Sequence, residues 1–414
     1  NKFSYNGNTS ANKVSLSHTP DLVDISGGYT RLVKIGDGHT VDLGMPELPL
    51  FSTYYQLDPS KTYEFRLNIV DSYFIEGIKV LPHQGMDKWE VESVSFINDD
   101  VYNSYESFPQ ENMMISNRSQ GRGVEFVNVS VIPYKYFPKH NKLEVYSSLD
   151  IEIIETGDRE VYELNQPKRS HIFDEFYKDI IINFEYSDRP EDYQASSILY
   201  IAGGSSLNNS FVQELINWRH KQGYIVYAVT ESEVGGSSAS TSEIKNYIQD
   251  AYYNWENPPE FVGLIGDTGS SYSLPNFTHS WGGYNGPTDF DYTQLDGGDL
   301  LPEIFIGRIS GSSSSTLDNV INKTIQYEKA TYVADDWFSK AGLIGDPDES
   351  GNSTIFTNQY IENIMINHGM NRVDTDYDGS GTESFMEQQF NRGILYYNYR
   401  GWYYGSGSYP TNSI

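Results

Sequence analysis

The sequence predicts a β-rich N-terminal domain followed by an α/β domain with a largely parallel sheet. Before residue 160, polar and apolar residues alternate with a period of two, as in 63–70 and 91–97, which is typical of strands with one buried face. After residue 197, short apolar runs ending in glycine or aspartate alternate with segments of helical periodicity. Such alternation predicts a parallel sheet covered by helices on both faces.

These patterns also predict the domain limits. Residues 1–160 form the β-rich domain, an antiparallel sandwich or barrel, and 161–196 form a connector. Residues 197–335 form a first α/β half-domain, and 336–414 begin a second one. Functional side chains are expected at the carboxyl ends of the parallel strands.

The connector has the features of a processing zone. It contains Lys168, Arg169 and Arg189, and few contacts are expected to cross between the domains on either side of it. The chain begins at Asn1 and stops inside a Gly/Ser/Tyr-rich stretch. We therefore expect a processed or shortened N-terminus and a remainder of the same polypeptide after Ile414.

Composition excludes several classes of function. The 414 residues contain no cysteine, which excludes disulfides, thiolate metal sites and thiol catalysis within this chain. The 57 acidic residues outnumber the 28 Lys and Arg residues, giving a net charge of −29 that disfavours nucleic acid and anionic membranes. No apolar run approaches the roughly 20 residues of a membrane helix. The absence of thiols, together with polar, Tyr-rich loops, favours a secreted or cell-surface protein. An acidic cytosolic protein is the alternative.

An acidic segment near residue 376 resembles a calcium loop. Asp374, Asp376 and Asp378 occupy alternate positions before a glycine, and Glu383 follows. Carboxylate oxygens at this spacing are typical calcium ligands, although Phe385 stands where the bidentate glutamate of such loops is expected. An acidic turn without an ion is the alternative. The eight histidines show no metal-ligand spacing, so each is expected to be structural or solvated.

Several segments occur in an order that closely resembles the gingipain family of cysteine peptidases. The α/β region contributes 261–267, 291–297, 301–310 and 393–401. Upstream, 44–49 and 170–173 resemble the propeptide of that family and the exit from it. The resemblance implies a caspase-like fold of two related half-domains, preceded by a β-rich propeptide that shields the enzyme.

The same resemblance assigns the site. The family uses a histidine in a Gly-His-Gly turn as base and a cysteine after a later strand as nucleophile. Glu303 matches an acid that could orient the histidine, and a buried structural acid is the equal alternative. Gly401 matches the first glycine, but Trp402 occupies the histidine position, and the cysteine would lie beyond Ile414.

Two hypotheses follow from this departure. The first is the N-terminal portion of a secreted cysteine endopeptidase precursor that acts on protein or peptide substrates. The second is a catalytically silent relative that serves as a surface or filament component or binds a partner through Tyr-rich loops. Under both, the 414-residue chain alone is expected to be inactive.

Overall fold

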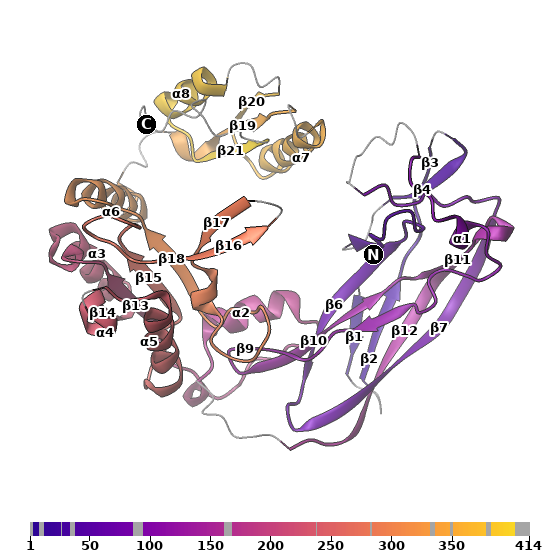
Figure 1. The fold of residues 1–414 in the computed structure, drawn as a ribbon, viewed down its shortest axis with the longest axis horizontal. Helices are drawn as coiled ribbons and strands as arrows, with labels where there is room; N and C mark the ends of the chain where they lie inside the picture. The colour runs from indigo at the N-terminus through magenta and orange to yellow at the C-terminus, as the bar shows by residue number, and fades with distance from the viewer. Residues whose placement is uncertain are drawn as a thin grey trace. The chain divides into compact units, whose positions relative to one another are not determined.

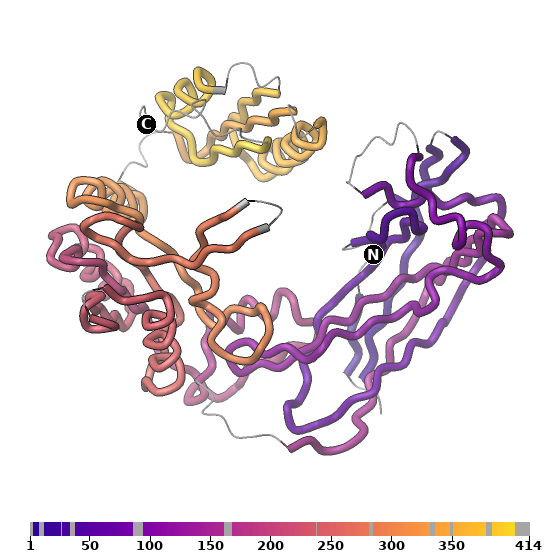
Figure 2. Tube along the Cα trace, viewed as in Figure 1, coloured from indigo at the N-terminus to yellow at the C-terminus, as the bar shows by residue number. Residues whose placement is uncertain are grey.

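The computed structural model describes residues 3–7, 12–25, 27–33, 38–85, 94–160, 168–236, 238–281, 284–331, 336–347, 351–377 and 382–401 (Figures 1 and 2). The chain divides into two compact units. The first comprises Asn1–Gly85 with Val91–Ile325, and the second comprises Met86–Glu90 with Gln326–Ile414. Each unit is described by itself.

The N-terminal part of the first unit contains two five-stranded antiparallel sheets. One has the order β1-β2-β12-β11, with β7 pairing β12. Its strands are β1 (Phe3–Asn6), β2 (Asn12–Ser17), β7 (Lys61–Glu76), β11 (Tyr134–Phe137) and β12 (Lys142–Asp158). The other has the order β5-β6-β10-β8, with β9 pairing β10. Its strands are β5 (Gly38–His39), β6 (Pro49–Leu57), β8 (Met113–Ile115), β9 (Ser119–Gly121) and β10 (Val124–Val131).

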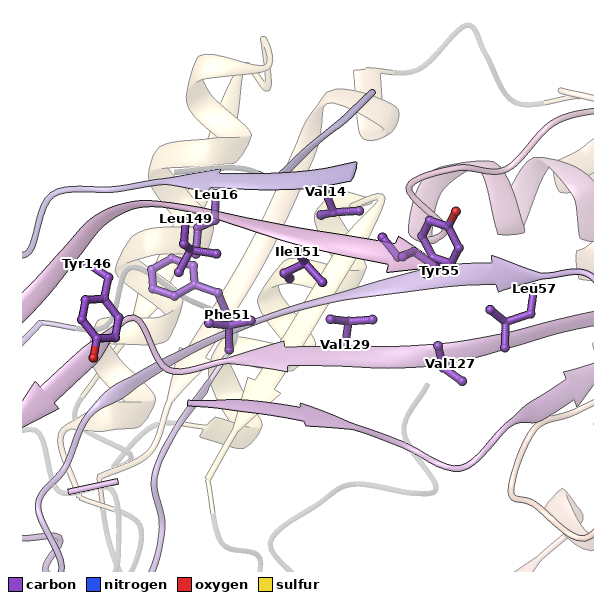
Figure 3. Close-up of a cluster of buried hydrophobic side chains, with 12 residues drawn as sticks. Val14, Leu16, Phe51, Tyr55, Leu57, Val127, Val129, Tyr146, Leu149 and Ile151 are labelled. Carbon is purple, nitrogen blue, oxygen red and sulfur yellow. The ribbon is translucent and has the colours of Figure 1, made fainter. Parts of the chain in front are cut away.

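Alternate residues of these strands form a common core. Val14, Leu149 and Ile151 come from the first sheet, and Phe51 and Val129 from the second; all are at most 3% exposed. Figure 3 shows these side chains gathered between the strands of the two sheets. A small hairpin, β3 (Leu22–Ile25) and β4 (Tyr29–Leu32), and the short helix α1 (Asp99–Tyr102) complete this part.

One expected strand does not form. The segment 94–97 of the predicted strand 91–97 is irregular, and 91–93 lie outside the described residues. The backbone amides of Ser95 and Phe96 donate hydrogen bonds to the side-chain oxygen of Gln84, at 2.8 and 3.0 Å. A side chain therefore takes the place that a neighbouring strand would occupy, which periodicity cannot show.

The α/β part of the first unit is a parallel sheet of four strands with the order β14-β13-β15-β18. These are β13 (Ser197–Ala202), β14 (Ile225–Thr230), β15 (Phe261–Ile265) and β18 (Phe305–Ile309), interleaved with α3 (Ser210–Lys221), α4 (Glu231–Gly235), α5 (Thr241–Asn254) and α6 (Ser314–Glu328). Leu199 and Ile201 pack in one cluster with Ile244 of α5, while Ile198 packs in another with Val212 of α3. Helices thus cover both faces, as the apolar runs predicted.

Local sequence sets where these helices begin. Ser240 and Glu243 form a capping box at the start of α5, and Asn209 accepts hydrogen bonds from the first amides of α3. Ser313 accepts a hydrogen bond from Thr316 N at the start of α6, within the serine run expected to cap that helix. A hairpin of β16 (Phe277–Trp281) and β17 (Tyr284–Thr288) follows β15, and α2 (His171–Ile180) lies in the predicted connector.

The second unit contains a three-stranded parallel sheet with the order β20-β19-β21. Its elements are β19 (Lys340–Gly345), α7 (Ser353–Asn367), β20 (Arg372–Asp376), α8 (Thr382–Arg392) and β21 (Tyr396–Arg400). A Cβ at Gly342 would meet Gln389 of α8, and one at Gly345 would meet Ile355 of α7. Because positions 342 and 345 face opposite sides of a strand, the two helices cover opposite faces, as Figure 1 shows. Among the described residues, no helix combines the length and apolarity needed to cross a membrane.

Candidate functional site

Glu303 is a fully buried acid two residues before β18. Its Oε2 accepts hydrogen bonds from the backbone amides of Leu295, at 2.6 Å, and Asp296, at 3.1 Å. Burial raises the pKa of Glu303 to about 7; the two amides oppose this rise, and the nearby Asp296 and Asp299 carboxylates add to it. The carboxyl group therefore changes charge near neutral pH, a property found both in functional acids and in buried structural ones.

Arg122, in the turn between β9 and β10, reaches the same place from the β-rich domain. Its side chain donates four hydrogen bonds and is only 2% exposed. Nη1 donates to the carbonyls of Glu303, at 2.9 Å, and Pro259, at 3.1 Å. Nη2 donates to the Gln194 side chain, at 2.8 Å, and to the Pro258 carbonyl, at 3.2 Å. All four acceptors precede strands of the parallel sheet, so the turn is anchored at the amino ends of these strands.

The environment of Arg122 suits a guanidinium ion. Burial lowers the pKa of Arg122, and the nearby Tyr252 and Glu260 side chains oppose that shift. The guanidinium carbon lies 5.1 Å from the ring centroid of Phe173. A planar fork of five N–H donors can serve several carbonyls at once, which a lysine ammonium cannot do with the same geometry.

Gln120, in β9 just before this turn, binds the loop whose backbone amides donate hydrogen bonds to Glu303. Its backbone amide donates to Asp299 Oδ2 and its side chain to Asp296 Oδ2, both at 2.9 Å. Glu303, Gln120 and Arg122 thus belong to one polar contact between the β-rich domain and the first α/β half-domain. We call this contact the Arg122 anchor.

Apolar packing by α2 extends the Arg122 anchor. Phe173 and Tyr177 pack in one buried cluster with Val124 and Phe126 of β10, and Phe305 of β18 packs against that cluster. The rings of Phe173 and Phe305 have centroids 4.7 Å apart. The two domains therefore contact each other through the predicted connector. We expected from the sequence that few contacts would join them. The reason is that α2 buries side chains against both domains.

Gly401 directly follows β21, at the carboxyl end where a site was expected. Beside it, Asp346 follows β19 and accepts a hydrogen bond from the Tyr399 hydroxyl at 2.9 Å. A Cβ at position 401 would lie only 2.7 Å from the Asp346 Cβ, so close packing requires glycine here. Trp402 lies outside the described residues. Glu303 belongs to the first unit and Gly401 to the second, and the catalytic roles assigned to them stay predictions.

The predicted calcium ligands are placed as follows. Asp374 and Asp376 lie on β20, and exposed Glu383 lies in the first turn of α8; Asp378 is outside the described residues. Arg372 Nε donates to both oxygens of Asp374, at 2.9 and 3.0 Å, and Arg392 also pairs with this carboxylate. Burial works to raise the pKa of Asp374, but hydrogen bonds from Arg372 and Gln389 and the arginine charges lower it overall.

Sequence reasoning missed Arg122. The available signal was an arginine between two glycines in a chain poor in basic residues. A Cβ at Gly121 would lie 2.6 Å from the Tyr177 hydroxyl oxygen, and Gly123 has a φ of 80°. Both glycines are therefore needed to bring the turn against α2.

Two models that describe one class of peptidase together match most of the sequence. The model of peptidase family C25 matches residues 191–411, and the propeptide model of that family matches 21–190. The chain belongs to peptidase family C25, and the resemblance to gingipain-type cysteine peptidases is confirmed.

Curated relatives come from Porphyromonas gingivalis. Gingipain R1 is 26% identical over 387 residues, covering 90% of this chain and 37% of that protein. Gingipain R2 is 25% identical, and the match covers 92% of this chain and 52% of that protein. A Lys-gingipain is 27% identical, and the match covers 95% of this chain and 23% of that protein. The chain thus spans between about a fifth and about half of the length of these relatives.

Solved structures of gingipains also match. The complex of the RgpB pro- and mature domains is 21% identical with a TM-score of 0.35, covering 45% of this chain and 97% of that one. The crystal structure of the Arg-specific cysteine proteinase gingipain R is 24% identical with a TM-score of 0.43, covering 50% of this chain and 46% of that one.

Proposed function

We propose that this chain is the N-terminal portion of a secreted or cell-surface gingipain-like cysteine endopeptidase precursor. Residues 1–160 are its propeptide domain, 161–196 the connector, and 197–335 and 336–414 parts of a caspase-like catalytic domain. The observation that carries this proposal is the Arg122 anchor, because it joins the region matched by the propeptide model to the region matched by the peptidase model.

Catalysis by such an enzyme would need residues that this chain does not supply. A thiolate attacks the scissile carbonyl, a histidine moves protons, and donors stabilise the oxyanion. The chain has no cysteine, and an indole at position 402 cannot exchange a proton near neutral pH. The nucleophile would come from the remainder of the polypeptide, and protein or peptide substrates would be bound there.

A catalytically silent surface, filament or binding protein is the second candidate. Trp402 favours it, because tryptophan at the position assigned to the catalytic histidine removes the base even where a cysteine follows. In that case Glu303 keeps only a structural role, holding the loop at Leu295 and Asp296.

Peptidase assays separate the two candidates. We predict that the purified 414-residue chain cleaves nothing in a mixed peptide library, and cleavage by it would refute the missing-nucleophile argument. The full-length precursor is then assayed after propeptide removal, with and without a thiol-directed inhibitor. Inhibitor-sensitive cleavage supports the peptidase. If the full-length parent cleaves no peptide and Trp402→His does, the catalytic base was lost at position 402. That result supports the catalytically silent relative.

Calcium binding at Asp374, Asp376, Asp378 and Glu383 stays a proposal. Calcium must compete with Arg372 and Arg392 for Asp374. We predict that excess chelator lowers the Tm, since an ion that binds only the native state stabilises it by mass action. Asp376→Asn should abolish this response, and an unchanged melting curve in the parent would end the proposal.

A further inference from the structure

Two histidines and a glutamate from three separate segments converge in the β-rich domain. His39 ends β5, Glu47 follows the bridge between Pro46 and Pro82, and His83 follows Pro82. Their ligand-forming atoms all lie within 4.8 Å of one another. His83 Nδ1 is 3.2 Å from Glu47 Oε2, and the centroids of the two imidazole rings are 5.4 Å apart. We call these three residues the His39 cluster.

Backbone hydrogen bonds fix the three segments. Thr40 N donates to Leu48 O at 3.0 Å, Glu47 N to Leu81 O at 2.8 Å, and His83 N to Met45 O at 2.8 Å. Leu48 and Leu81 are fully buried in the core below. The side chains of the His39 cluster are thus held in place by rigid neighbours, which reduces the ordering that a ligand must impose.

We propose that the His39 cluster binds a zinc ion. Two imidazoles and one carboxylate form a known zinc ligand set that leaves a fourth position for water or another donor. Tetrahedral ligands with bonds of about 2.1 Å lie roughly 3.4 Å apart, close to the 3.2 Å between His83 Nδ1 and Glu47 Oε2. A hydrogen bond between His83 and Glu47 alone would account for the distance between them. It would not account for the imidazole of His39 beside them.

The donor chemistry selects the class of metal. Imidazole nitrogen favours zinc and similar transition metals, whereas calcium prefers oxygen ligands. The cluster is therefore distinct from the acidic loop near Asp376. The side chain of His83 is 5% exposed and that of Glu47 14%, so water competes weakly for the ligand atoms.

Arg31 shapes the site in two opposing ways. Its Nε lies 3.3 Å from Glu47 Oε1, which orients the carboxylate so that Oε2 faces His83. Its positive charge also repels a dication, so we expect weaker binding than in closed four-ligand zinc sites. Bound zinc would tie β5 and the segment before β6 to the segment after β7, and would stabilise the β-rich domain.

The test is a zinc titration of the 414-residue chain by calorimetry. We expect one zinc per chain and a Tm that rises with zinc concentration. His39→Ala and Glu47→Gln should each weaken binding by at least about tenfold. Cobalt substitution should give the visible absorption of a tetrahedral site in the parent and not in His39→Ala.

His279→Ala is the matched control. Exposed His279 Nε2 lies 3.0 Å from both oxygens of Asp291, but among the described residues this pair belongs to no group of three metal-ligating side chains. The His279→Ala change should therefore leave zinc binding intact. Because His83 is nearly fully buried, His39→Ala is the deciding variant, with its fold checked by circular dichroism. Absence of saturable zinc binding in the parent, or parent-like binding by folded His39→Ala, would overturn the proposal.

Discussion

At the scale of single residues, the buried carboxyl of Glu303 links stability to pH. Its pKa rises from 4.5 to about 7 in the folded protein, so the native state binds this proton more tightly than the unfolded chain does. The contribution of Glu303 to the free energy of unfolding is therefore fully present below pH 4.5 and is lost as pH rises through 7. The difference between the two pKa values corresponds to about 3 kcal/mol.

Urea unfolding at pH 5 and pH 8 tests this linkage. The free energy of unfolding of the parent should fall more between the two pH values than that of Glu303→Gln, because glutamine stays neutral and can still accept the Leu295 and Asp296 amides. Glu106→Gln, at an exposed glutamate, is the control and should behave like the parent. Identical pH dependence in the parent and Glu303→Gln would contradict the assigned pKa.

The resemblance to the gingipain family singled out Glu303 as a functional or a buried structural acid, but it did not give the surroundings of this residue. Its burial depends on the loop at Leu295 and Asp296 and on Arg122, far away in sequence, and no local pattern encodes such contacts. The His39 cluster was missed for the same reason, because 36 residues separate Glu47 from His83.

At the scale of elements, the turn between β9 and β10 carries the Arg122 anchor. Arg122→Ala removes the guanidinium that donates to the buried carbonyls of Pro259 and Glu303, and should lower the free energy of unfolding by about 3 kcal/mol. Arg122→Lys should lower it less, since the charge stays but the fork is lost.

The control for this prediction is Arg66→Ala. Arg66 pairs with Glu64 on the surface, and its side chain is 56% exposed. Its removal should lower the free energy of unfolding far less than Arg122→Ala does, because exposed ion pairs add little to stability. Equal effects of Arg66→Ala and Arg122→Ala in urea unfolding would show that the Arg122 anchor adds nothing to stability.

Periodicity predicted most elements because their side chains report burial directly. The alternation of 63–70 belongs to β7, and the apolar run at 198–202 lies within β13. Periodicity wrongly predicted a strand at 94–97, where the Gln84 side chain accepts backbone hydrogen bonds, and it could not show that α2 packs on two domains. Both features depend on contacts with residues outside the segment itself.

At the scale of the whole molecule, the described part of the connector contains four basic residues, and we expect trypsin to prefer one of them. Lys178 is exposed but lies within α2, where the hydrogen-bonded helical backbone resists cleavage. Arg169 is protected, because its amide donates to Asp192 O and its carbonyl accepts from Gln194 N, while its side chain pairs with buried Asp174. Arg189 is exposed, but Pro190 follows it, and trypsin cleaves poorly before proline. Lys168 is exposed, so we expect the first cleavage of the predicted processing zone after this residue.

Limited trypsin digestion should therefore cut first after Lys168 and yield two pieces that stay together. The C-terminal piece keeps α2, whose Phe173 and Tyr177 remain buried against Val124 and Phe126 of the N-terminal piece. The Arg122 anchor also survives the cut. We expect the nicked parent to elute from gel filtration as one species, and nicked Arg122→Ala to separate to a larger extent. Nicked Arg66→Ala should stay associated like the parent. First cleavage within 197–400 would refute the domain boundary, and prompt separation of the nicked parent would show that the two domains are held by the covalent connection alone.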